Sequence, residues 1–74
     1  MRHYFIKIDD NGTRYRFMRM IEKRFKGIDI CLNIVDDVTI KTDAKTMGLI
    51  RKEFELKKFG RTNGRYELTK DLAA

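Results

Sequence analysis

Residues 28–42, IDICLNIVDDVTIKT, alternate apolar and polar side chains on either side of two adjacent aspartates. Alternation with a period of two is typical of strands that bury one face. The stretch therefore predicts two strands, 28–35 and 38–42, which pair as a hairpin around the turn Asp36-Asp37. Their inward side chains would be Ile28, Ile30, Leu32, Ile34, Val38 and Ile40. Because strands fill the middle of the chain, there is no room there for a further helix.

The chain before this hairpin predicts a strand and then a helix. Residues 2–8 alternate, with Tyr4, Ile6 and Ile8 on one face, and the turn signal DDNGT follows. In residues 14–26, RYRFMRMIEKRFK, the apolar side chains fall within about 100° of a helical projection. The opposite side of that helix would carry Arg16, Arg19, Lys23 and Lys26.

Local sequence signals predict where this helix begins and ends, and whether the segment is a helix or a strand. Thr13 is the expected N-cap, and Gly27 is the expected residue after the last turn. A competing interpretation makes residues 13–18 a second strand, joined to the first through Asn11-Gly12. The helix is the favoured of the two.

The chain after the hairpin predicts a second helix and a last strand. Thr42 or Asp43 would cap a helix over about 44–58. Its apolar stripe would consist of Ala44, Met47, Ile50 and Phe54. Residues 65–69, RYELT, predict a short strand, and residues 69–74 predict a frayed tail.

The resulting element order, β-α-β-β-α-β, predicts a single small α+β domain over residues 1–74. It matches the split βαβ, ferredoxin-like arrangement, with two helices on one face of an antiparallel sheet and the other face open. The alternative is a winged helix, in which residues 44–58 read DNA and the loop 61–65 is the wing. Residues 50–68 resemble the helix and wing of winged-helix repressors only in a generic way, and the usual third helix is missing from the pattern.

The open face of such a sheet would carry Phe5, Lys7, Cys31, Asn33, Thr39, Lys41 and Glu67. Sheets that stack RNA bases usually offer two or three aromatic side chains, and Phe5 is the single aromatic residue in this set. The sequence therefore favours contacts to phosphates over base stacking.

The residue types in the chain give little support for catalysis or for cofactor binding. The chain has no Ser, and its single Cys, Cys31, has one His, His3, as a partner. His3 with Arg2 or Lys41 is the one candidate group for RNA cleavage. Paired aspartates stand at turns, where Asp is common without a metal. We therefore expect no enzyme activity, no cofactor and no metal site.

Charge gives the strongest functional signal. The net charge is +6 and the isoelectric point is about 9.7, which favours an acidic partner. The sequence predicts a non-catalytic nucleic-acid-binding regulator or accessory protein, with the type of nucleic acid left open. Its contact residues would be Arg16, Arg19, Lys23 and Lys26, with Arg61 and Arg65 extending the same basic surface.

A second hypothesis is a protein-binding inhibitor or accessory module of the phage or plasmid type, docking on an acidic surface of a host protein. Apolar positions that could lie exposed (Leu49, Leu56 and Phe5) favour it. A homodimer is a further option, since a chain this short gains from completing its core with a second copy. No apolar run approaches the ~20 residues of a membrane span, so we expect a cytoplasmic protein without a membrane partner.

Overall fold

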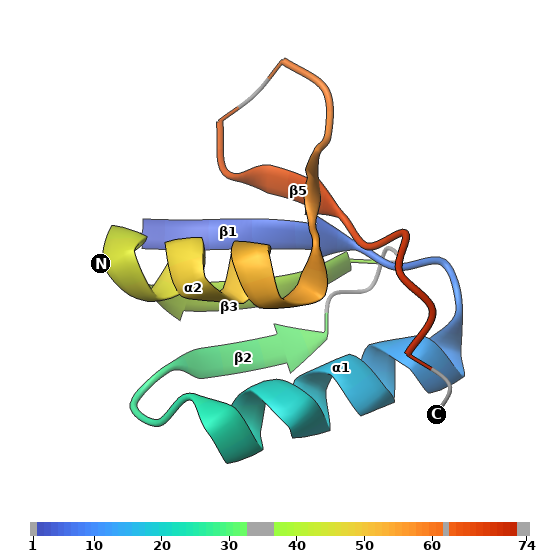
Figure 1. Ribbon diagram of the computed structural model, residues 1–74, viewed down its shortest axis with the longest axis horizontal. Coiled ribbons are helices and arrows are strands. Elements are labelled where there is room, and N and C mark those ends of the chain that lie inside the picture. The colour runs from blue at the N-terminus through green and yellow to red at the C-terminus, as the bar shows by residue number, and fades with distance from the viewer. Residues whose placement is uncertain (1, 33–36, 62, 73–74) are drawn as a thin grey trace.

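The computed structural model describes residues 2–32, 37–61 and 63–72. In chain order its elements are β1 (Arg2–Lys7), α1 (Asn11–Arg24), β2 (Asp29–Leu32), β3 (Asp37–Thr42), α2 (Ala44–Phe54), β4 (Lys57–Lys58) and β5 (Arg65–Glu67). The strands form one sheet in the order β2-β3-β1-β5-β4 (Figure 1). β1 and β5 run parallel, and the other neighbouring pairs are antiparallel.

The predicted α+β class and the order of elements as far as α2 are confirmed. The sheet differs from the expected one in two ways: it has a fifth strand, and its β1–β5 pair is parallel. Both differences arise because a hairpin, β4–β5, takes the place of the single last strand. The two helices found in the described part of the chain lie on either side of the β2–β3 hairpin in sequence, which does not match the helix content of a winged helix.

The hairpin exists because α2 ends early. The helix was expected to reach residue 58, but it ends at Phe54, and Glu55 adopts a left-handed conformation with φ 53° and ψ 44°. Phe54 and Leu56 are both buried. If the helix continued, residues 54 and 56 would be about 200° apart around its axis, so one of the two side chains would face water. Ending the helix at Phe54 allows both side chains to be buried.

The segment 13–18 is helical, as favoured, but α1 begins at Asn11 rather than after Thr13. Asp10 is the N-cap, and its carboxylate accepts hydrogen bonds from the backbone N–H of Thr13 at 2.8 Å and from its hydroxyl at 2.9 Å. Asp43 caps α2 in the same way and accepts from the N–H of Thr46 at 2.7 Å. Each helix therefore begins at an aspartate that precedes a threonine by three residues.

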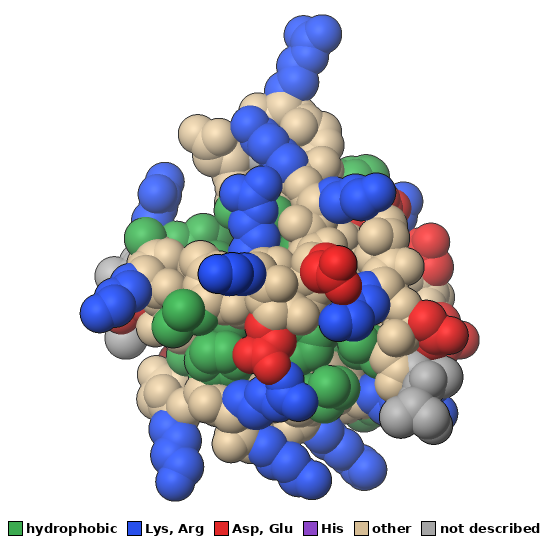
Figure 2. Space-filling model, viewed as in Figure 1, with side chains coloured by type: hydrophobic (Ala, Val, Ile, Leu, Met, Phe, Trp, Pro, Cys, Tyr) green, Lys and Arg blue, Asp and Glu red, His purple; other side chains and the backbone are tan. Residues whose placement is uncertain are grey.

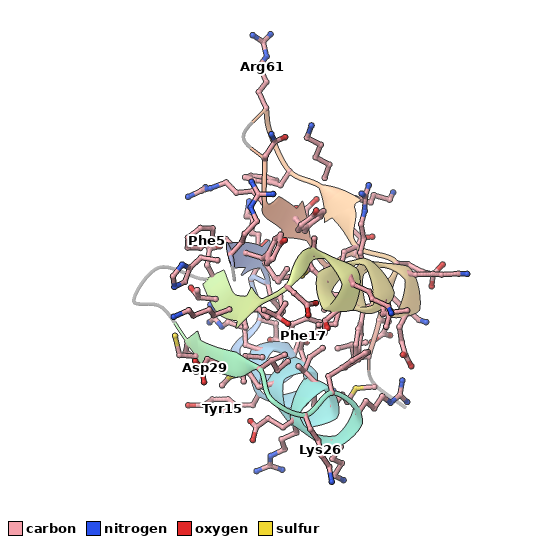
Figure 3. All side chains as sticks on the ribbon, turned by 90° about the vertical axis from the view of Figure 1, so that its left-hand side faces the viewer. Phe5, Tyr15, Phe17, Lys26, Asp29 and Arg61 are labelled. Carbon is pink, nitrogen blue, oxygen red and sulfur yellow. The ribbon has the colours of Figure 1, made fainter. Side chains whose placement is uncertain are left out.

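Both helices pack on one face of the sheet, and the core lies between these two layers (Figure 3). From the sheet come Tyr4, Ile6, Val38 and Ile40, all buried. At the centre, Phe17 of α1 meets Phe54 of α2 edge to face, with ring centroids 4.9 Å apart and planes at 69°. This aromatic pair joins the two helices to each other above the strands.

Two remaining expectations concern segments between and after the elements. Pairing of β2 with β3 is confirmed from Ile30↔Ile40 and Leu32↔Val38, whereas Asn33, Ile34 and Asp36 lie outside the described residues. Residues 69–74 were expected to fray. Instead, Leu72 packs against the core and Lys70 forms an ion pair with Glu55 at 3.2 Å, while residues 73 and 74 lie outside the described part.

Truncating the central aromatic pair should weaken the fold strongly. Phe54→Ala is expected to lower the free energy of unfolding by about 3–5 kcal/mol, because it removes a large buried side chain and leaves a cavity against Phe17. Urea unfolding followed by circular dichroism measures this. Tyr15→Ala, at a side chain that is 56% exposed, is the control and should change stability by less than about 0.5 kcal/mol. Similar losses for both variants would contradict the described core.

The cap of α2 should make stability depend on acid pH. Hydrogen bonding by the Thr46 side chain and by its backbone N–H lowers the pKa of Asp43 below its usual 3.8. A lowered folded-state pKa means that the cap stabilises fully above pH 3.8, and that this stabilisation is lost as the pH falls through the folded pKa. Asp43→Asn keeps a capping side chain that does not titrate. The melting-temperature advantage of the wild type over this variant should shrink in acid, and an advantage that is independent of pH would refute the assignment.

Candidate functional site

The outer face of α1 is cationic. Arg16, Arg19, Lys23 and, just beyond the helix, Lys26 are all exposed. None of these four forms an ion pair with another described residue. A fifth cation, Arg24, instead forms an ion pair with Glu53 of α2. Unpaired cations that repeat every three or four residues along a helix can each reach a phosphate of one passing strand.

An exposed aromatic side chain borders this cationic face. Tyr15 is 56% exposed and precedes Arg19 by four residues, so the two side chains are neighbours on the helix surface. Figure 3 shows Tyr15 projecting from α1 away from the core, whereas Phe17 points into it. An exposed tyrosine beside arginine offers a flat surface on which a nucleobase can stack.

The two loop arginines lie elsewhere. Arg61 and Lys26 stand at opposite ends of the molecule, which measures 29 × 28 × 23 Å (Figure 3). Figure 2 likewise shows Lys and Arg side chains gathered over the β4–β5 loop and, separately, below α1. The single basic surface expected from the sequence is therefore two surfaces, one on α1 and one around the hairpin. Arg65 belongs to β5 and lies over the ring of Phe5, 5.4 Å from its centroid.

The open face of the sheet has alternating charges and a second aromatic residue. Strand register places Asp37, Lys7, Glu67 and Lys57 in one row across four strands. Phe59, which follows β4, lies under the ammonium group of Lys7 at 4.9 Å. The expectation of one aromatic side chain on this face is corrected to two, Phe5 and Phe59, each covered by a cation. Alternating charges leave this face less attractive to a polyanion than α1.

Of the residues considered for catalysis, His3 and Lys41 lie opposite each other in the β1–β3 register, whereas His3 and Cys31 do not come together. Cys31 lies on β2 and His3 on β1, with β3 between them. Through β3, Cys31 aligns with Phe5 and not with His3, so the backbones of Cys31 and His3 are more than two strand spacings, or ~10 Å, apart. Within the described residues, no group of three or more His, Cys, Asp or Glu side chains could hold a metal ion.

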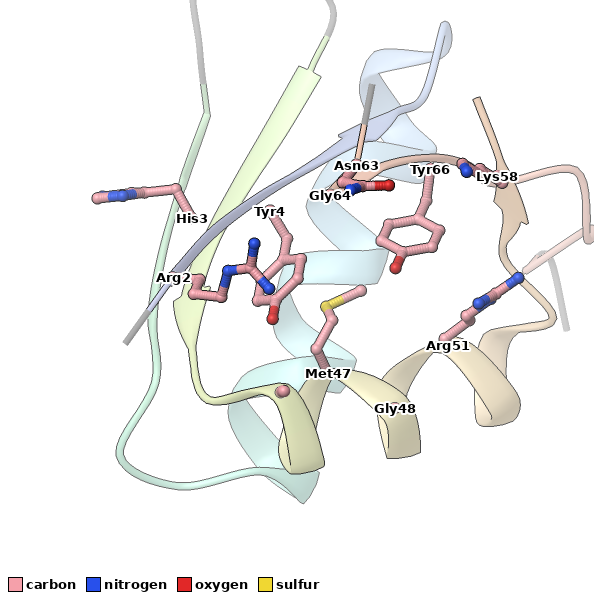
Figure 4. Close-up of a pocket in the computed structure, with 11 residues that line it drawn as sticks. Arg2, His3, Tyr4, Met47, Gly48, Arg51, Lys58, Asn63, Gly64 and Tyr66 are labelled. Carbon is pink, nitrogen blue, oxygen red and sulfur yellow. The ribbon is translucent and has the colours of Figure 1, made fainter. Parts of the chain in front are cut away.

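A hollow of about 410 Å³ opens between the start of β1, one side of α2 and the β4–β5 hairpin (Figure 4). Three cations line it, each from a different element: Arg2 from β1, Arg51 from α2 and Lys58 from β4. Its walls also include Tyr4, Tyr66, Met47, Gly48, Asn63 and Gly64. No Asp or Glu is among the described residues that line it.

The hairpin is held against β1 by backbone contacts that set the shape of this hollow. The N–H of Phe5 donates to the carbonyl of Gly64 at 2.8 Å, and the N–H of Leu68 donates to Lys7 at 3.1 Å. Gly64 has φ +85°, and a Cβ there would lie 3.4 Å from the carbonyl oxygen of His3. A glycine thus suits both the left-handed backbone and the close approach of the loop to β1.

Sequence reasoning did not find this hollow because its cations are scattered along the chain. Arg2 and Arg51 are far apart in sequence, and the helical pattern of residues 44–58 places Lys58 at the end of a longer α2. The one local signal was the stretch 56–66, LKKFGRTNGRY, which has two glycines and four cations and no acidic residue. That pattern is typical of a cationic hairpin.

Neither helix in the described part of the chain is long and apolar enough to cross a membrane. Comparison of the chain with protein-family models, with curated proteins and with solved structures gave no match.

Proposed function

We propose that the protein is a small, non-catalytic nucleic-acid-binding regulator or accessory protein that acts in the cytoplasm. The observation that carries the proposal is the outer face of α1, where Arg16, Arg19, Lys23 and Lys26 are exposed and form no ion pair with other described residues. A net charge of +6 adds long-range attraction for a polyanion.

The chemistry of this face favours phosphate contacts. Arginine and lysine side chains on one helix can neutralise successive phosphates without reading the base sequence. Arg16 and Lys23, seven residues apart, are separated by about 10 Å along the helix axis. Tyr15 supplies one stacking surface at the border of the face. We therefore expect binding that depends strongly on salt and weakly on sequence.

Removing two cations from α1 should change both affinity and salt dependence. Arg16→Ala/Lys23→Ala is expected to weaken binding by about tenfold or more at low salt. It should also lower the slope of log K against log salt by about two, one for each lost phosphate contact. Fluorescence anisotropy with labelled duplex and single-stranded oligonucleotides, titrated at several salt concentrations, measures both quantities.

The chain offers a matched control on the other helix. Lys45 and Lys52 of α2 are also exposed and also seven residues apart, so Lys45→Ala/Lys52→Ala removes the same charge from another surface. This control should lose less affinity and keep the slope. Arg61→Ala/Arg65→Ala should also lose less than the α1 variant. No binding of the wild type at low salt would refute the function, and equal losses in all three variants would refute the α1 surface.

One observation favours the alternative, a module that docks on an acidic surface of a host protein. Leu49 of α2 is 54% exposed and, with Phe25, Lys52 and Glu53, lines a shallow depression. Of the other two apolar candidates, Leu56 is buried and Phe5 is half-buried beneath Arg65. A homodimer could use the same depression.

Leu49→Lys separates the alternative from the main proposal. In a pull-down from nuclease-treated lysate, a specific partner that the wild type retains and this variant loses would favour protein docking. Sedimentation of both proteins at two concentrations identifies self-association through Leu49. Nucleic-acid binding should not be weakened in Leu49→Lys, because Leu49 does not belong to the α1 face and the change adds a positive charge.

A further inference from the structure

We propose that the hollow between β1, α2 and the β4–β5 hairpin binds a nucleoside monophosphate, either free or as the phosphorylated end of a strand. This inference goes beyond the function proposed above. It uses none of the α1 cations, and the free nucleotide would bind even if α1 contacted no nucleic acid.

The phosphate would be held by Arg2, Arg51 and Lys58. These cations reach the hollow from three separate elements, and no carboxylate among the described lining residues neutralises them. A phosphate monoester, with a charge between −1.5 and −2 near neutral pH, would supply the negative charge that this lining lacks. Figure 4 shows Arg2 in front of Tyr4, with Arg51 and Lys58 beyond Tyr66.

Arg51 is already positioned before any ligand arrives. Its guanidinium lies over the ring of Tyr66, 5.2 Å from the centroid. Stacking on an aromatic ring restricts the long side chain while leaving its N–H donors free to reach a phosphate oxygen. Less side-chain entropy is therefore lost on binding than for an unrestrained arginine.

The rest of the hollow suits an organic group attached to the phosphate. Its volume of about 410 Å³ lies within the usual range for small-molecule sites. The apolar part of the wall beside the cations is the half-buried ring of Tyr66, together with the small exposed parts of Tyr4 and Met47, and the Tyr4 and Tyr66 ring centroids are 6.4 Å apart. A nucleobase has the flat, aromatic face that packs on such a wall.

On the α2 side of the hollow, one lining position is a glycine and has no side chain. Gly48 lines the hollow on an exposed turn of α2, and a Cβ added there would meet no heavy atom within 4 Å. A side chain added at this position therefore starts in free space and does not displace a neighbour at its Cβ. Gly48 permits a variant that places bulk at the wall of the hollow without removing a charge.

Thermal unfolding in a phosphate-free, low-salt buffer tests the ligand class. The probes are the four common ribonucleoside 5′-monophosphates, the matching nucleosides and inorganic phosphate. At about ten times its Kd, a monophosphate should raise the melting temperature by about 5–10 °C. The nucleosides should give no shift, and inorganic phosphate should bind at least about tenfold more weakly. Nucleosides that bind as well as monophosphates would overturn the proposal.

Two variants locate the binding. Gly48→Leu should abolish the shift while leaving the melting temperature of the free protein unchanged or higher, because leucine is a better helix former than glycine. Arg51→Leu should weaken monophosphate binding by about 10–100-fold, the effect of losing a charge-assisted hydrogen bond. Lys52→Leu removes the same charge from the next residue, which does not line the hollow, and should bind normally. Wild-type affinity in Gly48→Leu would overturn the proposal.

Oligonucleotides distinguish the two sources of the phosphate. The binding of three short single strands of the same sequence is compared: one with hydroxyl ends, one with a 5′-phosphate and one with a 3′-phosphate. If a strand end is the source, a phosphorylated end should bind more tightly than the same strand with hydroxyl ends, and Gly48→Leu should remove the difference. If the free nucleotide is the source, strand phosphorylation has no effect while the monophosphate still binds. Failure of every oligonucleotide to bind, with the monophosphate retained, would refute the α1 function and support the hollow.

Discussion

The structure depends on the early end of α2. Because Phe54 and Leu56 are both buried, the chain leaves the helix at Glu55, whose left-handed backbone turns it back toward the sheet. The residues that would have formed a further helical turn instead form β4, and β5 then lies beside β1 in the parallel direction. The fifth strand, the second aromatic residue on the open face and the cationic hollow all follow from this turn.

The molecule has two cationic regions that differ in shape: the outer face of α1 and the hollow beside the β4–β5 hairpin. The α1 face is convex and exposed, and its cations repeat along a helix, which suits a long polyanion. The hollow is concave, and its cations come from three different elements, which suits a small anion. The alternating charges of Asp37, Lys7, Glu67 and Lys57 on the open sheet face suit neither. The positive charge of the molecule is thus presented on two surfaces of different curvature, and each surface suits a different shape of anion.

Much of the fold could be predicted from local patterns. Alternation identified β1 and the β2–β3 pair, helical periodicity identified α1, and the aspartate before Ala44 marked the start of α2. The end of α2 could not be predicted in this way, because residues 44–58 continue an amphipathic helical pattern and only tertiary burial of Leu56 stops it. The pairing of β5 with β1 joins the two ends of the chain, which no local pattern encodes. The α1 cations were found because they share one helix, whereas those of the hollow meet only after folding.

The two-residue strand β4 also affects how the molecule behaves in a crowded solution. An edge strand offers unpaired backbone groups to any other chain that can extend the sheet. β4 is the edge beyond β5, and both of its residues, Lys57 and Lys58, are exposed lysines. A short edge with two like charges gives an incoming strand few hydrogen bonds and repels a second copy of itself. Both features disfavour extension of the sheet from the β4 edge, and they therefore act against fibril formation on this side of a molecule with many exposed cations.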